Sequence, residues 1–187
     1  MNPVTFQQGI KPYRNDSGFT ALINRSKTAG FQKCNGMKKK YVFNYSSHLR
    51  HYEAAVFALR CFDNRFWKIF KHFMKHLGLG DIDPESPAGG AKVLASPEKR
   101  GDRNFMLREI EKSIRLHHTK KIMLFAHHDC GAYGGIARFN GDEEKEFVFH
   151  CQELAKAQKI VQEKFPKLKV KTYFIDEQGV VDTTDIS

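Results

Sequence analysis

The sequence predicts an α/β domain in which a four-stranded, mainly parallel sheet is flanked by helices. The first observation is that apolar runs of strand length alternate with segments whose apolar residues recur at helical spacing, between about residues 54 and 175. Such alternation is typical of parallel sheets, because a crossover helix joins each strand to the next. The second observation is size: 187 residues with 41% apolar content can bury one core but are too few to indicate two domains.

Residues 1–40 are expected to form a basic, largely irregular arm that precedes a single α/β domain at 41–187. Turn-forming residues are frequent in the arm, and no apolar period is sustained there. A short helix is predicted at Phe19–Ile23, and aromatic residues mixed with polar ones predict a further helix at Tyr41–Tyr52. We interpret Met37, which precedes three lysines, as a candidate start of the compact protein.

The net charge of +10 is concentrated in the amino-terminal part of the chain. Residues 1–50 hold nine Lys or Arg against one acidic residue, whereas residues 51–187 hold 22 against 20. A basic arm could contact RNA, an anionic membrane or an acidic partner, but a solvated tail is more common, so a nucleic-acid function is not expected. No apolar run reaches the length of a membrane span and no secretory signal is evident, so we expect a cytoplasmic protein.

The first strand is predicted at Ala54–Leu59, which is continuously apolar and of strand length. A helix should follow at Phe66–Leu77, because six apolar residues lie there at helical spacing, and Gly78 is a natural stop. This apolar stripe is interpreted as a surface that faces the core. The next segment, 81–90, is rich in Pro, Gly and acidic residues and is expected to be a loop, followed by a short second strand at Ala91–Ala95.

Two further strands and two further helices complete the alternation. Arg103–His117 carries four apolar residues on one helical face, with Asp102 available as a cap or as a first-turn acid. The third strand is predicted at Ile122–Ala126 and the fourth at Val170–Ile175. Between them a long helix is expected over about 142–164, because its acidic start suits the helix dipole.

Two motifs that could bind a metal follow the first and third predicted strands. Cys61 comes just after the first strand, and His127 with Cys130 comes just after the third. Thiolates and imidazoles are ligands that Zn²⁺ prefers, and one turn can supply both His127 and Cys130. In an open parallel sheet, sites form beyond the carboxyl ends of the strands where the strand order reverses, so neighbouring first and third strands would bring the three side chains together. The alternative interpretation is that both cysteines are buried core thiols.

The order of these motifs resembles that of the β-class carbonic anhydrases, especially their short prokaryotic members. The resemblance covers about residues 54–179 and depends on Cys61-x-Asp63-x-Arg65, the small-residue turn Ala88-Gly89-Gly90, and His127-x-x-Cys130-Gly131. It implies a parallel sheet of strand order 2-1-3-4, and a homodimer or higher even oligomer with active sites near the subunit interface. It also implies that Zn²⁺ is the cofactor and that 41–187 is a single zinc-binding catalytic domain. The residues carried over are Cys61, His127 and Cys130 as metal ligands, and Asp63 with Arg65 as the catalytic pair.

The activity that the resemblance implies is zinc-dependent, reversible hydration of carbon dioxide to bicarbonate and a proton by zinc-bound hydroxide. Asp63, held by Arg65 through charge-assisted hydrogen bonds, would orient the zinc-bound water, and it could itself ligate zinc in a closed, inactive state. Two alternatives stay open: a carbonyl sulfide or carbon disulfide hydrolase of the same fold, and a non-catalytic protein with structural zinc and a basic binding arm. The intact pair of Asp63 and Arg65 argues against the second alternative, because a structural zinc site does not need it.

Several residues near these motifs keep two interpretations. His128 is either a neighbour without a chemical role or a relay of protons to solvent. Asp129 could cap the following helix or bond to Arg65. Cys34 and Cys151 are expected to take no part in the site, and the irregular spacing of the four cysteines argues against a disulfide scaffold.

Overall fold

The computed structural model describes residues 40–46 and 49–186. The chain divides into two units, Met1–His48 and Leu49–Ser187, and the elements described below lie in the second. The strands are β1 (Val56–Leu59), β2 (Ile82–Glu85), β3 (Lys121–His127), β4 (Lys169–Ile175) and β5 (Val180–Asp182). The α-helices are α2 (Trp67–His76), α3 (Lys92–Ala95), α4 (Arg100–His117) and α5 (Glu143–Lys164). Three short 3-10 helices are η1 (Asn64–Phe66), η2 (Gly131–Tyr133) and η3 (Ile136–Phe139).

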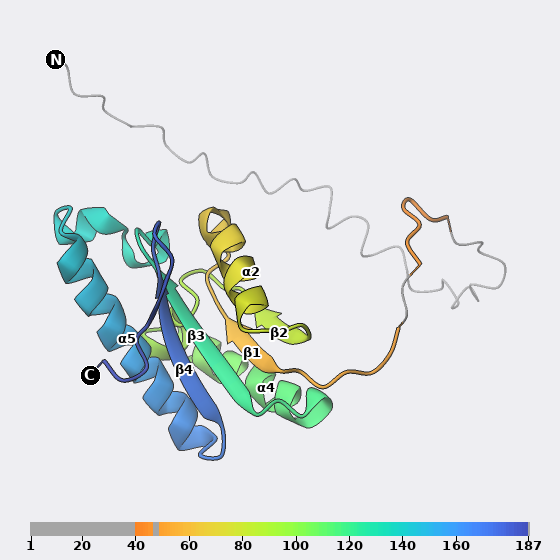
Figure 1. The fold of residues 1–187 in the computed structure, drawn as a ribbon. Coiled ribbons are helices and arrows are strands. Elements are labelled where there is room, and N and C mark those ends of the chain that lie inside the picture. The colour runs from red at the N-terminus through yellow and green to blue at the C-terminus, as the bar shows by residue number, and fades with distance from the viewer. Residues whose placement is uncertain (1–39, 47–48, 187) are drawn as a thin grey trace, which may run out of the picture. The chain divides into compact units, whose positions relative to one another are not determined.

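The five strands form one sheet in the order β2-β1-β3-β4-β5 (Figure 1). The strands from β2 to β4 run parallel, and β5 pairs antiparallel with β4. The predicted α/β class, the mainly parallel sheet and the order 2-1-3-4 are confirmed, and β5 is an addition to the four predicted strands. Because β1 lies beside β3, with Leu59 opposite Leu124, their carboxyl ends meet at one edge of the sheet.

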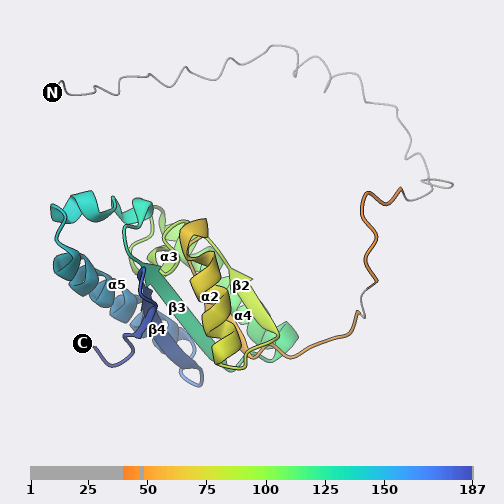
Figure 2. The same cartoon turned by 45° about the horizontal axis from the view of Figure 1, so that its top comes forward.

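Helices cover both faces of this sheet, with α2 on one side and α4 and α5 on the other (Figures 1 and 2). The side chains of β1 alternate between the two faces. Phe57 and Leu59 pack with residues of α3, α4 and α5, whereas Val56 and Ala58 pack with residues of α2. A strand buried on both faces has no polar alternation, which explains why β1 is a continuous apolar run in the sequence.

The apolar stripe predicted for the first helix faces the core, as expected. In α2, Phe70 and Met74 are buried, and the ring of Phe70 meets that of Phe125 edge to face with 5.3 Å between centroids. The helix ends close to the predicted stop, because Gly78 adopts the left-handed conformation at φ +67° that favours glycine.

The second strand does not lie where it was predicted. Ala91–Ala95 is not a strand, because Lys92–Ala95 forms the short helix α3 and buries Leu94 against α4 and α5. A short apolar run fits a strand and a buried helical turn equally well. Here Gly89 and Gly90, both at positive φ, turn the chain sharply so that the run enters a helix.

The second strand of the sheet lies instead within the segment predicted to be a loop. β2 pairs with β1 and forms an edge of the sheet. Its Pro84 indicates a loop in sequence, but a residue without a backbone N–H is tolerated on an edge strand. Asp83 and Glu85 also argue against a strand in the sequence, because acidic residues are depleted in strands generally.

Both long helices have an acidic residue at or near their start, as predicted, although α4 begins at Arg100 and not at Arg103. Asp102 lies in the first turn of α4, and its carboxylate accepts a hydrogen bond from the N–H of Lys99 at 3.2 Å. Asp142 is the N-cap of α5, and its Oδ1 accepts from the N–H of Lys145 at 3.0 Å. Each carboxylate satisfies an N–H group that the helix leaves free at its start.

The expectations for the amino-terminal part have different outcomes. The helix predicted at Tyr41–Tyr52 is wrong for the described residues of that segment, which contain no helix. Its aromatic residues at 41, 43 and 45 recur at every second position and so do not share one helical face. The helix predicted at Phe19–Ile23 and the start proposed at Met37 lie outside the described residues. Among the helices that the structure describes, none is long and apolar enough to cross a membrane.

Candidate metal centre

The sheet brings Cys61, His127 and Cys130 together. Cys61 follows the end of β1 by two residues, His127 is the last residue of β3, and Cys130 ends the turn that follows. The Sγ atoms of the two cysteines and one ring nitrogen of His127 all lie within 4.8 Å of one another. The expected convergence of these three side chains is therefore present, and it results from the parallel pairing of β1 with β3.

The imidazole of His127 is oriented for ligation. The ring is buried, with Nδ1 2.8 Å from the carbonyl oxygen of His128. Since a carbonyl can only accept, Nδ1 carries the proton and Nε2 keeps its lone pair. Nε2 is buried and has no hydrogen-bond partner among the described residues. A buried nitrogen lone pair without a partner beside two thiols fits a site for a soft divalent cation.

The two thiols occupy unequal positions within the cluster. The neighbouring thiol of Cys130 lowers the pKa of Cys61, whereas the neighbouring Cys61 raises the pKa of Cys130. Cys61 Sγ also accepts a hydrogen bond from the backbone N–H of Gly89 at 3.3 Å. Donors directed at Cys61 favour its thiolate form, which is the form that binds metals.

The turn at Gly89 and Gly90 supports Cys61 in a way that the sequence does not reveal. Gly90 adopts φ +57°, and a Cβ atom there would lie 2.6 Å from the carbonyl oxygen of Phe125 and 2.8 Å from the backbone nitrogen of Cys61. Backbone atoms at such distances cannot move aside, so this position requires glycine. The two glycines were recognised in the sequence as part of a small-residue turn, but the hydrogen bond from the N–H of Gly89 to the sulfur of Cys61 was not predicted.

Asp63 and Arg65 form a pair beside the cluster. Asp63 Oδ2 accepts from Nε of Arg65 at 3.0 Å and from the terminal guanidinium nitrogen NH2 at 2.7 Å. Its Oδ1 accepts from the backbone N–H of Arg65 at 2.9 Å. These bonds lower the pKa of Asp63, whose side chain is 21% exposed, and keep it ionised. Its carboxylate faces Arg65, and it does not belong to the group of three potential ligands.

Asp129 makes both of the contacts that the sequence left open. Its Oδ2 accepts from NH1 of Arg65 at 2.9 Å, and its Oδ1 accepts from the N–H of Ile136, the first residue of η3, at 3.0 Å. Its carbonyl oxygen accepts a further bond from NH2 of Arg65 at 2.9 Å. Arg65 is therefore held from both sides, by Asp63 and by Asp129.

Glu146 is a residue of this region that the sequence interpretation missed. It lies on α5, is fully buried, and contacts both residues between His127 and Cys130. Its Oε2 is 2.6 Å from Nδ1 of His128, and its Oε1 accepts from the N–H of Asp129 at 2.8 Å. The sequence contained one signal for it. Glu146 shares a helix face with Leu154 and Ala157, which are buried, and a buried acidic side chain must have a polar partner.

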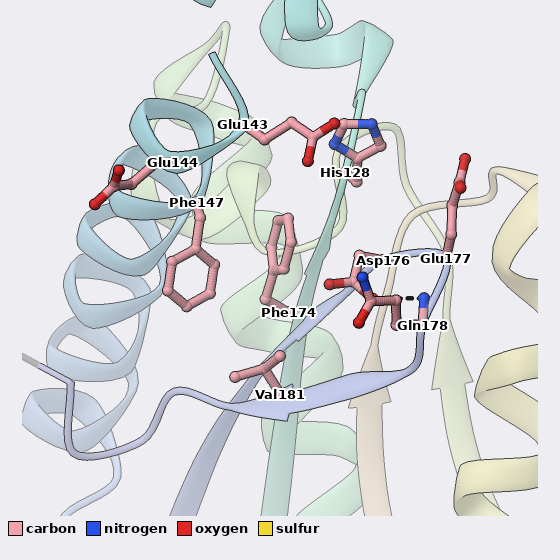
Figure 3. Close-up of a pocket in the computed structure, with 9 residues that line it drawn as sticks. All are labelled: His128, Glu143, Glu144, Phe147, Phe174, Asp176, Glu177, Gln178 and Val181. Carbon is pink, nitrogen blue, oxygen red and sulfur yellow. Dashed lines mark hydrogen bonds between the residues drawn. The ribbon is translucent and has the colours of Figure 1, made fainter.

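An acidic cavity of about 430 Å³ lies next to His128, at the carboxyl end of β4 and the start of α5 (Figure 3). Its lining includes the carboxylates of Glu143, Glu144, Asp176 and Glu177. None of the three potential metal ligands lines it. His128 thus joins the cluster region to a solvent-facing cavity, and its proposed relay role stays a prediction.

Comparison with known proteins agrees with this arrangement. Residues 52–185 match the family described as "Putative carbonic anhydrase". An uncharacterized protein of Rickettsia bellii is 34% identical over 133 residues, which is 70% of this chain and 81% of the relative. The carbonic anhydrase from Streptococcus mutans has a TM-score of 0.50 at 17% identity, covering 74% of this chain and 87% of that one. The β-carbonic anhydrase isoform I from Trichomonas vaginalis has a TM-score of 0.50 at 12% identity, covering 75% and 88%.

At these identities the solved structures establish the fold, and the family match covers most of the chain. The matched region contains the β1 and β3 ends, the three potential ligands and the pair of Asp63 with Arg65. The chain belongs to the family described as putative carbonic anhydrases, and it has the fold of the β-carbonic anhydrases.

Proposed function

We propose that this chain is a zinc-dependent carbonic anhydrase that converts carbon dioxide and water reversibly into bicarbonate and a proton. The observation that carries the proposal is the buried cluster of two thiols and one imidazole within 4.8 Å, with Nε2 of His127 left without a partner. The pair of Asp63 with Arg65 beside it also supports catalysis, because a purely structural zinc site needs no such pair.

Cys61, His127 and Cys130 would hold the metal. Two thiolates balance the charge of Zn²⁺, and three protein ligands leave one of the four tetrahedral positions open, as is usual for catalytic zinc. When bound, Zn²⁺ would supply Lewis-acid chemistry that makes a water molecule nucleophilic near neutral pH. Gly89 would support the thiolate of Cys61 through its N–H, and the carbonyl of His128 would fix the tautomer of His127.

Asp63 would orient the attacking water. Its carboxylate is ionised and held by Arg65, so it can accept a hydrogen bond but cannot rotate freely. Arg65 in turn cannot leave Asp63 without also breaking its bonds to Asp129. A water molecule that donates one hydrogen to Asp63 keeps an oxygen lone pair for carbon dioxide, so the residue contributes by orientation.

The remaining expectations about the molecule are proposals of the same kind. We expect a homodimer or higher even oligomer, and the exposure of Phe62 supports it. This aromatic side chain is 65% exposed although it lies between Cys61 and Asp63, and a second subunit would cover it. We also propose that residues 1–40 are a basic arm outside the catalytic domain at 41–187, in a cytoplasmic protein.

The test is stopped-flow hydration of carbon dioxide from mildly acidic to alkaline pH, on protein of measured zinc content. Activity should scale with bound zinc and rise with pH, and Asp63→Ala should lower it by about 100-fold while zinc content is retained. Glu177→Ala is the matched control, because it removes an exposed carboxylate from the same edge of the sheet without touching Arg65. Zinc-loaded wild-type protein that is inert at every pH would overturn the proposal and favour structural zinc.

Substrate choice needs a separate comparison. Carbonyl sulfide and carbon disulfide would be attacked by the same nucleophile, so the identity of the metal ligands does not separate them from carbon dioxide. Turnover of the three substrates should be measured on one zinc-loaded preparation. We expect carbon dioxide to have the highest kcat/KM, and a higher value for either sulfur compound would assign the chain to the hydrolase alternative.

A further inference from the structure

We propose that Glu146 is a positioning residue that fixes the peptide unit orienting the imidazole of His127. The inference deepens the proposed function, because it assumes that His127 is a metal ligand. It concerns a residue on α5, far in sequence from both metal motifs, with no ligand atom of its own in the group of Cys61, His127 and Cys130.

One peptide unit links Glu146 to His127. The carbonyl of His128 accepts from Nδ1 of His127 at 2.8 Å, and the N–H of the same peptide, which belongs to Asp129, donates to Oε1 of Glu146 at 2.8 Å. The two groups point in opposite directions from one rigid plane. Glu146 therefore holds the peptide in the orientation that keeps Nε2 of His127 directed at the cysteines.

The conformation of Asp129 gives this support a physical role. Asp129 adopts φ +52°, a left-handed conformation that costs most non-glycine residues about 1–2 kcal/mol and that aspartate tolerates better than most. A peptide next to such a residue has an alternative orientation in which its carbonyl would turn away from His127. The bond to Glu146 opposes that flip, and the bond from Arg65 to the carbonyl oxygen of Asp129 holds the following peptide.

The second oxygen of Glu146 holds the same turn through a side chain. Oε2 lies 2.6 Å from Nδ1 of His128, whose own backbone N–H donates to the carbonyl of Ile175 at 2.9 Å. Glu146 is fully buried, and a buried carboxylate is costly unless hydrogen bonds satisfy it. Both of its satisfying bonds come from the two residues between His127 and Cys130, so its cost is offset at this turn.

Three substitutions separate geometry from charge and from packing. Glu146→Leu keeps most of the side-chain volume but has no acceptor, so the peptide of Asp129 loses its anchor. Glu146→Gln keeps a carbonyl oxygen for the N–H of Asp129, and its NH₂ can donate to Nδ1 of His128 in the other tautomer. Asp83→Ala is the control, because Asp83 is also largely buried and hydrogen-bonded, but its partners are Tyr52, Ser113 and His117.

The readouts are Zn²⁺ affinity, by competition with a chromophoric chelator, and the absorption spectrum of the Co²⁺-substituted protein, which reports ligand geometry. Glu146→Leu should weaken Zn²⁺ binding by about 10–100-fold and change the Co²⁺ spectrum, as for other residues that orient a ligand. Glu146→Gln should stay within a few-fold of wild type with a near-native spectrum. Asp83→Ala should leave both readouts unchanged even where it lowers thermal stability.

Two results would overturn the inference. One is wild-type Zn²⁺ affinity and Co²⁺ spectrum in a folded Glu146→Leu protein. The other is an equal loss in Glu146→Gln, which would assign the effect to charge. Should Glu146→Leu fail to fold, Glu146→Asp, whose shorter side chain cannot span both bonds, gives the same comparison. Neither readout needs hydration activity, so inert but zinc-binding wild-type protein would count against the proposed function alone.

Discussion

Two regions of this domain each bury a carboxylate among polar side chains, yet they differ in what is left unsatisfied. Around Asp83 on β2, the carboxylate accepts from the hydroxyls of Tyr52 and Ser113 and from Nδ1 of His117 at 2.5–2.9 Å. Burial disfavours its charge, but these bonds outweigh burial and lower the pKa of Asp83. No side-chain polar atom of this group is buried without a partner in the described structure.

The turn after β3 is built in the same way except at one atom. Glu146, like Asp83, has both oxygens bonded, and Arg65 is held on two sides. Nε2 of His127, however, is buried without a partner, and it faces two thiols. Buried polar groups are normally satisfied. Arg60 and His150 also have unsatisfied buried nitrogens among the described residues, but only Nε2 of His127 lies in the group with the two thiols, which makes it a candidate metal ligand. The difference indicates that the polar groups around Asp83 satisfy one another and stabilise the fold, whereas the turn after β3 leaves a nitrogen lone pair that could bind a metal.

The largest effect should come from removing one of the thiols of the cluster. Cys130→Ser should lower Zn²⁺ affinity by more than about 100-fold, because loss of a ligand exceeds loss of a residue that merely orients one. Cys151→Ser is the matched control, since Cys151 is also a buried free cysteine but is not in the cluster. Zinc stoichiometry and affinity check the prediction, and equal losses in both variants would erase the distinction between the two regions.

The glycine turn beneath Cys61 should be the next most sensitive position. Gly90→Ala should lower the free energy of unfolding by about 2–4 kcal/mol, because its Cβ would lie 2.6 Å from the carbonyl oxygen of Phe125 at a strained φ. Gly101→Ala is the control with the opposite sign. Gly101 lies in α4 with no atom near its missing Cβ, so alanine should stabilise by about 0.5–1 kcal/mol. Urea denaturation of both variants measures the difference, and equal shifts would contradict the close packing at Gly90.

The convergence of the three potential metal ligands could be predicted from sequence, because their motifs follow two continuous apolar runs of strand length. Cys61 and His127 each close a continuous apolar run, and the carboxyl ends of neighbouring parallel strands must meet. The same reasoning failed for β2, because Pro84 and the acidic residues beside it resemble a loop. This segment is a strand because it pairs with β1. An edge strand depends on its neighbour more than on its own residues.

The residues that orient the ligands could not be predicted, because their contacts join segments far apart in the chain. The N–H of Gly89 meets Cys61 across 28 residues, and the N–H of Asp129 meets Glu146 across 17. The bond of Asp129 to Arg65, across 64 residues, was one of two contacts that the sequence left open. Glu146 has a helical position that shows burial but not its partner. Sequence patterns therefore locate the ends of elements, whereas bonds between the loops that follow them require the fold.

Removing the carboxylate of Asp83 should lower stability moderately and leave metal binding unchanged. Asp83→Ala should lower the free energy of unfolding by about 1–3 kcal/mol, since the side chain is only 12% exposed and its partners lose their acceptor. Hydration activity per bound zinc should not change. Thermal denaturation and stopped-flow assays of the same preparation test both statements, and a loss of activity would show that the two regions are coupled.

An effect that appears only below neutral pH concerns His150, which is fully buried on α5 with neither ring nitrogen bonded in the described structure. Burial lowers the pKa of His150 to about 4, and Arg138, His127 and His128 act in the same direction, although Glu153 opposes them. In the unfolded chain, His150 therefore binds a proton below about pH 6.5, whereas in the folded chain it binds one only below about pH 4. Stability that is complete above pH 6.5 should be lost as the pH falls through this window, by up to about 1.4 kcal/mol per pH unit.

His150→Phe, which keeps a ring against Tyr133 and Phe174, should flatten that slope relative to wild type. Urea denaturation at pH 7, 6 and 5 measures it, and the difference between the two proteins cancels the contribution of the cysteines and other groups. Parallel stability curves would mean that His150 takes up its proton at the same pH in the folded and the unfolded chain. Glu146, 3.7 Å away, would then act as its counter-ion, and this buried carboxylate would have a partner besides the turn after β3.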